Sequence, residues 1–281
     1  MAWLEVHFYS HVLGLSCAMN VILPEPAQGV GTDASGWDGE RELPVLYLLH
    51  GVSDDHTIWM RRTSIERYAA GKQLAIVMPA VHRSYYSNQK CGYDYLKFIG
   101  EELPLICRRF FRISSKREDN FVAGLSMGGY GAMKVGLNYP DRYGAVASMS
   151  GILDIASVGK ERGYDLVCDG ERMEKLRATD RENYLKAMDF RMNFGTLEEF
   201  KDSENDLSFL LGKAVAEGVT LPKLFISMGT EDFLYQTNVS FRKELDQHRV
   251  KYDYLELPGR HEWGVWDFCI QKVLEWLPLK T

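Results

Sequence analysis

The feature that most constrains the fold of this chain is a short apolar run that recurs and ends each time at small or polar residues. The clear examples are PVLYLLHG (44–51), LAIVMPA (74–80), NFVAGLS (120–126) and KLFISMGT (223–230), and GAVASMSG (144–151) is a weaker one. Runs of this kind are typical of strands that are buried on both faces of a parallel sheet. We therefore expect these five segments to be strands of one sheet.

The segments between these runs are long enough to form helices, at 57–71, 93–111, 127–139 and 235–248. Alternation of strands and helices predicts an α/β fold with a mostly parallel central sheet and helices on both faces. Two further patterns occur at the ends of the chain. WLEVHFYS and LSCAMNVILP are typical of an antiparallel hairpin, while YDYLELPG (252–259) and residues 262–278 predict a last strand and an amphipathic helix.

Two segments depart from this rhythm. Residues 24–43 are rich in Pro, Gly and Asp and predict an exposed loop. Residues 152–217 are charged and mostly helical in composition, so we interpret them as a helical insertion into a single domain that spans 1–281. Such an insertion either caps the carboxyl ends of the strands, where ligands bind in sheets of this kind, or is a solvated excursion without a binding role.

Composition narrows the class of protein. Of the 281 residues, 46% are hydrophobic and 26% are charged, an ordinary globular mixture. The net charge is -6 and no long basic run occurs, so we expect no nucleic-acid partner. The N-terminus lacks a basic segment followed by an apolar stretch, and no apolar run approaches the length of a membrane span. We therefore expect neither a signal peptide nor a membrane association.

The cysteines indicate a reducing compartment. They are odd in number and widely spaced, at Cys17, Cys91, Cys107, Cys168 and Cys269. This pattern favours free thiols over a disulfide framework or a structural zinc site, so we expect a cytoplasmic protein. No cofactor is predicted, and the sequence leaves open whether the chain forms a homo-oligomer.

The motif GLSMG, residues 124–128, places Ser126 between an apolar run and a helix-length segment. It matches G-x-S-x-G, in which a serine nucleophile lies on a sharp turn from strand to helix. In so tight a turn, side chains beside the serine would collide with neighbouring backbone, and glycine removes the Cβ atom. The context therefore favours a nucleophile over a glycine-rich turn without chemistry.

A serine nucleophile needs a base, and the base needs an orienting carboxylate. In α/β-hydrolases the acid and then the histidine follow the serine in the chain. Only His248 and His261 follow Ser126. His261 lies after the predicted last strand, at the sheet edge where catalytic side chains gather, so we prefer it to His248, which we expect on a helix surface.

Candidate acids lie in the loop after the KLFISMGT run. Glu231 and Asp232 both follow this predicted strand, and either carboxylate could face the histidine. The structural alternative for Asp232 is a cap of the following helix. Asp253, in or beside the last strand, is expected to be structural.

The oxyanion of an acyl-transfer intermediate needs two preplaced N–H donors. Met127, which follows the nucleophile, supplies one candidate, and Val52, in the loop after the first core strand, supplies the other. His50 precedes the nucleophile and is predicted to orient this loop. A zinc-site interpretation of His50, Asp54, Asp55 and His56 lacks a second group of ligands, so no metal site is predicted.

Linked motifs extend these assignments along most of the chain. They are PVLYLLHGVSDDHTIWMRRTSIERY, LAIVMPAVHRSYYSN, GYDYLKFIGEELP, SKREDNFVAGLSMGGYGAMK, GTEDFLYQTN and GRHEWGVWD. Together they resemble the tributyrin esterase group of the esterase D / S-formylglutathione hydrolase family. The resemblance implies an α/β-hydrolase fold and hydrolysis of short-chain carboxylic esters, with a small-molecule ester as the partner.

Residue by residue, the resemblance implies that Ser126 is the nucleophile, Asp232 the acid and His261 the base. It places the oxyanion amides at Val52 and Met127. One departure favours oxygen esters over glutathione thioesters, because true S-formylglutathione hydrolases resemble SGLTC where this chain has HGVSDD.

Substrate preference is less constrained. Five aromatic residues near predicted strand ends are candidates for lining an acyl or alcohol pocket, with core packing as the alternative: Trp59, Tyr85, Tyr86, Tyr235 and Trp263. Acetyl to butyryl esters, acylated sugars and feruloyl esters all fit. The alternatives to a serine esterase are a thioesterase or acyltransferase with the same triad, and a catalytically inactive binding protein on this fold.

Overall fold

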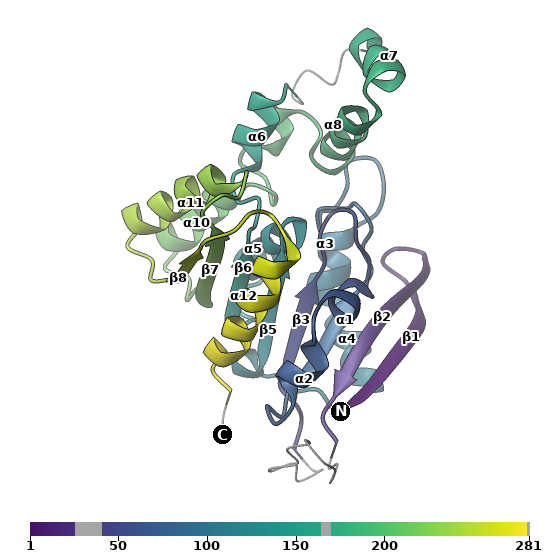
Figure 1. Cartoon of the computed structure of the whole chain (residues 1–281), viewed down its shortest axis with the longest axis vertical. Helices are drawn as coiled ribbons and strands as arrows, with labels where there is room; N and C mark the ends of the chain where they lie inside the picture. Colours follow the sequence, from purple (N-terminus) through teal and green to yellow (C-terminus); the bar gives the residue numbers. More distant parts are fainter. Residues whose placement is uncertain (26–40, 164–169, 280–281) are drawn as a thin grey trace.

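The structure, a computed structural model, describes residues 1–25, 41–163 and 170–279 (Figure 1). Most of the loop predicted at 24–43 lies outside the described residues. So does a short stretch of the predicted insertion, 164–169, which includes one of the five cysteines.

An eight-stranded sheet in the order β1-β2-β4-β3-β5-β6-β7-β8 forms the centre of the molecule. Its strands are β1 (Ala2–Ser10), β2 (Leu15–Leu23), β3 (Val45–Leu49), β4 (Ala75–Pro79), β5 (Asn120–Leu125), β6 (Ala145–Met149), β7 (Lys223–Gly229) and β8 (Asp253–Leu257). Strand β2 pairs antiparallel with both β1 and β4. All the other neighbours in this order, from β4 and β3 to β7 and β8, pair in parallel. Every predicted strand is confirmed, including the weak one at 144–151.

Helices cover both faces of the sheet, as predicted. One face packs against α3 (Tyr95–Lys97), α4 (Leu103–Phe110), α5 (Met127–Asn138) and α11 (Tyr235–Gln247), and the other against α1 (Ile58–Arg62), α2 (Ile65–Ala69) and α12 (Trp263–Trp276). Strand β3 shows why: Tyr47 and Leu49 belong to the first core and Leu46 and Leu48 to the second, and all are fully buried. This is the α/β-hydrolase arrangement.

Two predicted helices are interrupted. The segment 57–71 is split at Thr63, whose extended backbone ends α1 and whose hydroxyl donates to the Trp59 carbonyl at 2.6 Å. The segment 93–111 contains a π-helical turn over Phe98–Glu102. There the Tyr139 ring packs so closely on Gly100 that a Cβ atom would meet it at 2.1 Å. Tertiary contact therefore distorts a helix that the local pattern predicts to be regular.

The insertion between β6 and β7 is helical, with α6 (Ile155–Glu161), α7 (Gly170–Thr179), α8 (Arg181–Phe194), α9 (Leu197–Phe200) and α10 (Leu207–Ala216). In Figure 1, α6, α7 and α8 lie above the sheet, at the top of the view. The guanidinium of Arg83, in the loop after β4, pairs with both carboxylate oxygens of Asp189 on α8. The Lys90 N–H donates to the Met192 carbonyl at 2.8 Å. These contacts join the insertion to the loop after β4.

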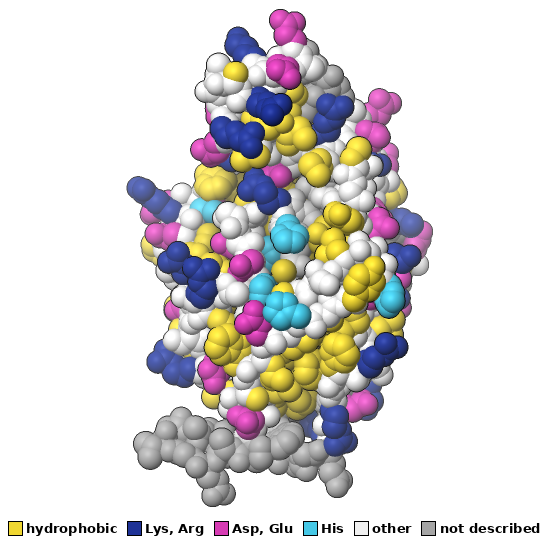
Figure 2. All heavy atoms as spheres, turned by 90° about the vertical axis from the view of Figure 1, so that its right-hand side faces the viewer, with side chains coloured by type: hydrophobic (Ala, Val, Ile, Leu, Met, Phe, Trp, Pro, Cys, Tyr) yellow, Lys and Arg dark blue, Asp and Glu magenta, His cyan; other side chains and the backbone are white. Residues whose placement is uncertain are grey.

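The sheet ends at β1, on the side of the molecule that Figure 2 faces. Alternate residues of this strand point outward, and Trp3 and Tyr9 are each more than half exposed. Acidic and basic side chains are intermixed around this face in Figure 2. Among the residues that the structure describes, no helix combines the length and apolar character needed to cross a membrane.

Candidate active site

Ser126 lies on a sharp turn between β5 and α5. Its backbone has φ 53° and ψ -118°, a conformation that costs a non-glycine residue free energy. The turn exists because its neighbours are glycines: a Cβ atom on Gly124 would meet the Gly128 carbonyl oxygen at 2.4 Å, and one on Gly128 would meet the Leu49 carbonyl oxygen at 2.5 Å. The predicted reason for the two glycines is confirmed.

His261 lies in the loop between β8 and α12, and its ring contacts Ser126. The serine Oγ is 2.9 Å from His261 Nε2. Two aromatic rings pack against the imidazole, Phe233 with a centroid distance of 4.6 Å and Trp266 at 4.8 Å. The ring is thus held at the end of the sheet with one nitrogen directed at the serine hydroxyl.

Asp232, in the loop after β7, contacts the other side of the imidazole. Its carboxylate oxygens lie 2.8 and 3.0 Å from His261 Nδ1, and its side chain is fully buried. The Leu234 N–H donates to the same carboxylate at 2.9 Å, which fixes its orientation. Because a carboxylate only accepts, Nδ1 carries the proton and Nε2 is free to accept from Ser126.

The other candidate acids and bases lie elsewhere. Glu231 is exposed, and among the described residues the contact of its backbone N–H is with the Gly259 carbonyl at 3.0 Å. Asp253 accepts from the Trp276 indole at 2.7 Å, and His248 caps the C-terminal end of α11. The structure therefore brings together Ser126, Asp232 and His261 and leaves the alternatives at other positions.

The loop after β3 packs beside Ser126. A Cβ atom on Gly51 would lie 3.8 Å from the Ser126 Cβ and 2.9 Å from a methyl group of Leu125. Val52 and Met127 both line the pocket that contains Ser126. Within the described part of the chain, the N–H groups of these two residues donate to no other backbone group, so both are available to a ligand.

His50 is buried and its protonation is defined by two backbone groups. Its Nδ1 lies 2.7 Å from the Gly51 carbonyl oxygen, which can only accept, so Nδ1 carries a proton. The Val81 N–H donates to Nε2 at 3.1 Å, so Nε2 carries none. Burial lowers the pKa of His50 to about 4, which keeps this ring neutral near neutral pH. This geometry agrees with the predicted role of His50 in orienting the loop.

The pocket beside Ser126 has a volume of about 320 Å³ and is mainly apolar. Its walls come from five parts of the chain: the loop after β3, the loop after β4, the turn between β5 and α5, the insertion and the loop after β7. The lining residues are Val52, Ser53, Arg83, Tyr85, Ser126, Met127, Ile152, Val158, Arg162, Glu182, Leu185, Lys186, Phe233 and Leu234.

Of the five aromatic residues considered as candidates for lining the pocket, only Tyr85 does so. Trp59 is fully buried in the core, where its indole N–H donates to the Leu49 carbonyl at 3.1 Å. Trp263 packs edge-on against Trp59 and Trp266. The Tyr235 hydroxyl donates to Glu256 at 2.8 Å. Tyr86 is fully buried, and its hydroxyl donates to the His50 carbonyl at 3.0 Å. We correct the expectation for these four residues, because each is turned toward packing or surface partners.

Much of the pocket lining carries no signal in the sequence. Phe233 directly follows the acid, so its position beside the histidine could have been inferred from that neighbour. Val158 and Leu185 come from the insertion, and no motif marks them. As for metals, the described residues contain no group of three or more His, Cys, Asp or Glu side chains arranged to hold an ion.

Comparisons with known proteins show the family to which the chain belongs. The model of the family described as "Putative esterase" matches residues 10–277. An acetyl esterase of Caldicellulosiruptor saccharolyticus is 30% identical over 281 residues, covering 99% of this chain and 98% of that protein. Two solved Staphylococcus aureus structures are each 34% identical, with 98% of both chains covered. They are the fluorophosphonate-binding serine hydrolase FphF, with a TM-score of 0.79, and the S-formylglutathione hydrolase FrmB, with 0.76.

Proposed function

The chain belongs to this esterase family and is a carboxylic ester hydrolase, and from that premise we propose a serine esterase that acts through an acyl-enzyme on Ser126. The observation that carries the proposal is the continuous contact from Ser126 Oγ through His261 to Asp232, at 2.9 and 2.8 Å. Three groups from three separate strand ends meet in the geometry that activates a serine hydroxyl.

In the proposed reaction, Ser126 Oγ attacks the ester carbonyl while His261 Nε2 takes the hydroxyl proton. Asp232 holds the imidazole and stabilises the imidazolium that forms. The N–H groups of Val52 and Met127 stabilise the oxyanion. His261 then returns the proton to the leaving alkoxide, the C–O bond breaks, and water repeats the sequence to release the acid.

The pocket supports an apolar acyl group of modest size. At about 320 Å³ it lies at the small end of ligand pockets, and most of its lining is apolar. We propose acetyl to butyryl esters as the substrates, with acylated sugars and feruloyl esters as further candidates for the alcohol or acyl part. We further propose that residues 152–217 act as a cap, because Ile152, Val158 and Leu185 of this insertion line the pocket.

A thioesterase is the second candidate function. It is favoured by the 34% identity to an S-formylglutathione hydrolase, and the HGVSDD sequence weighs against it. An acyltransferase would use the same serine with an alcohol in place of water. Turnover of S-formylglutathione against a butyryl oxygen ester, with and without added alcohol acceptors, separates the three activities.

The test of the proposal is a pair of serine substitutions. Ser126→Ala should lower turnover of a chromogenic butyryl ester by at least about a thousandfold and abolish labelling by a fluorophosphonate probe. Ser150→Ala is the matched control, because Ser150 follows the neighbouring strand β6 with a similar backbone, at φ 48°, but is fully buried. It should retain turnover and labelling. Wild-type turnover by Ser126→Ala would overturn the proposal.

A further inference from the structure

Three consecutive carbonyl groups at the end of β3 each accept a hydrogen bond from a buried side chain. The Trp59 indole N–H donates to the Leu49 carbonyl at 3.1 Å, and the Tyr86 hydroxyl donates to the His50 carbonyl at 3.0 Å. The His50 imidazole donates to the Gly51 carbonyl, with 2.7 Å between the atoms. The three donor side chains are at most 1% exposed. We call Trp59, His50 and Tyr86 the carbonyl clamp.

The clamp acts on the backbone that precedes Val52. In a trans peptide the C=O and N–H bonds point to opposite sides, and the described residues contain no cis peptide bond. A donor that holds the Gly51 carbonyl therefore also fixes the direction of the Val52 N–H. The Tyr86 and Trp59 bonds hold the two preceding peptide planes in the same way.

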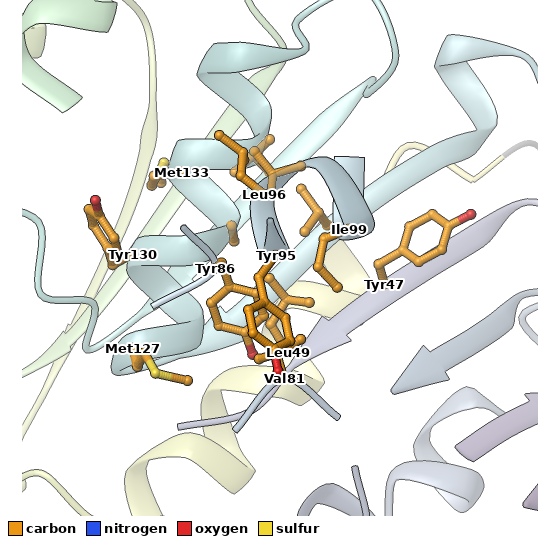
Figure 3. Packing of buried hydrophobic residues seen from close by; sticks show 14 of the residues in the cluster. Tyr47, Leu49, Val81, Tyr86, Tyr95, Leu96, Ile99, Met127, Tyr130 and Met133 are labelled. Atoms are coloured by element: carbon orange, nitrogen blue, oxygen red, sulfur yellow. The ribbon is translucent and has the colours of Figure 1, made fainter. Parts of the chain in front are cut away.

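Tyr86 is itself held tightly against the nucleophile helix. A Cβ atom on Gly131 of α5 would lie 2.3 Å from the Tyr86 ring, so this glycine makes the space that the ring occupies. Figure 3 shows Tyr86 near Leu49, beside the helix that carries Met127 and Tyr130. Burial raises the pKa of Tyr86 well above its usual value, so its hydroxyl remains a donor.

Lys134, also on α5, holds the residues on either side of Tyr86. Its Nζ donates to the Tyr85 carbonyl at 2.8 Å and to the Ser87 hydroxyl at 2.6 Å, and the side chain is fully buried. Tyr85 and Tyr86 both have positive φ, at 50° and 54°, which costs free energy unless neighbouring contacts enforce it. A buried amino group bonded to this turn is such a contact.

We propose that the carbonyl clamp is the positioning device of the oxyanion hole, and that Tyr86, set in place by Lys134, fixes the loop so that the Val52 N–H faces the oxyanion on Ser126. Trp59, His50 and Tyr86 are positioning residues, since they act through the backbone and touch no substrate. The inference rests on the proposed serine mechanism, because an oxyanion hole matters only if Ser126 forms a tetrahedral intermediate.

The decisive variant is Tyr86→Phe, which removes one oxygen atom and keeps the ring. It should lower kcat by about tenfold and leave KM within about twofold, since a misplaced donor should cost less than a deleted one. Affinity for an alkyl trifluoromethyl ketone, which forms a tetrahedral oxyanion on the serine, should fall by a similar factor. Tyr143→Phe is the control, because Tyr143 is equally buried and its hydroxyl has no partner among the described residues.

Two substitutions of His50 distinguish its contact with the Gly51 carbonyl from its contact with the Val81 N–H. In His50→Asn the amide lies where Nδ1 was and can still donate to the Gly51 carbonyl. In His50→Gln the amide lies where Nε2 was, so it can accept from the Val81 N–H but leaves no donor at the Nδ1 position. His50→Asn should therefore retain more ketone affinity than His50→Gln. The reverse order would overturn the role of the Gly51 carbonyl.

Unchanged kcat in Tyr86→Phe, or a lower kcat with unchanged ketone affinity, would overturn the proposal. Ser126→Ala in the same assay separates the two levels of inference. If Ser126→Ala is inactive and Tyr86→Phe behaves as wild type, only the clamp fails. If Ser126→Ala keeps its activity, the serine mechanism itself fails.

Discussion

At the scale of single residues, the site depends on backbone conformations that few residues tolerate. Ser126 adopts a positive φ, and the two nearby glycines allow the turn because they have no side chain to collide with β3 and α5. The packing of the surrounding elements offsets the free energy cost of this turn. The chemistry therefore depends on glycines that contribute no reactive group.

Gly128→Ala tests this dependence. The added methyl group would meet two backbone carbonyl oxygens, of Leu49 at 2.5 Å and His50 at 2.7 Å, which cannot move aside cheaply. We expect a loss of about 1–3 kcal/mol in the free energy of unfolding, together with lower kcat, measured by denaturant titration and ester turnover. Gly212→Ala is the control, since Gly212 lies in α10 and the nearest described side chain to its Cβ position is that of His248, at 3.8 Å. It should stabilise the protein by up to about 1 kcal/mol. Equal effects of the two changes would contradict the account.

His50 should make the free energy of unfolding decrease as the pH falls. Its pKa is lowered from 6.5 to about 4 by burial, so the folded protein binds fewer protons than the unfolded chain below pH 6.5. The contribution of the neutral ring is fully present above pH 6.5 and is lost as the pH falls toward 4, by on the order of 3 kcal/mol in total.

Denaturant titrations between pH 7 and pH 4 measure this term. The free energy of unfolding of His50→Gln should fall less steeply over that range than that of the wild type, because glutamine does not titrate. Parallel curves for the two proteins would show that His50 is not the group responsible.

At the scale of elements, the insertion supplies a wall of the pocket. Helix α8 contributes Leu185 to the lining and is joined to the loop after β4 through the Arg83–Asp189 ion pair. This position supports the proposal that residues 152–217 act as a cap, the first of the two interpretations that the sequence leaves open. A helix that lines the pocket influences which acyl groups fit, whereas a solvated excursion has no such effect.

Leu185→Trp tests this wall. A larger side chain should fill part of the pocket, so kcat/KM should fall more for a hexanoyl ester than for an acetyl ester, by about tenfold in their ratio. Leu105→Trp on α4 is the control, because Leu105 is 60% exposed and lies outside the pocket lining. An unchanged ratio in Leu185→Trp would favour the solvated interpretation.

At the scale of the whole molecule, the sheet and the triad contacts could be predicted because each leaves a short-range pattern. The apolar runs mark the strands, and GLSMG, Asp232 and His261 each follow one of them. The pocket could not be predicted in the same way. Trp59 is a candidate lining residue by sequence. The end of helix α1 at Thr63 and the hydrogen bond from the Trp59 indole to the Leu49 carbonyl instead place it in the core.

Lys134 illustrates the same limit. A lysine on a helix is ordinarily at the surface, and nothing near it in the sequence indicates that it is fully buried. Its partners Tyr85, Ser87 and Asn205 are remote in the chain and are brought to it only by the folded structure. Contacts between distant segments thus define the parts of the site that local patterns omit.

The most direct test of the central claim is to identify the acylated residue. The protein is mixed with excess p-nitrophenyl butyrate, quenched in acid within the first turnovers, digested and analysed by mass spectrometry. The account predicts a mass increase of one butyryl group on the peptide that contains Ser126, absent from Ser126→Ala. Rapid turnover with no acylated peptide, or with the butyryl group on another residue, would contradict it.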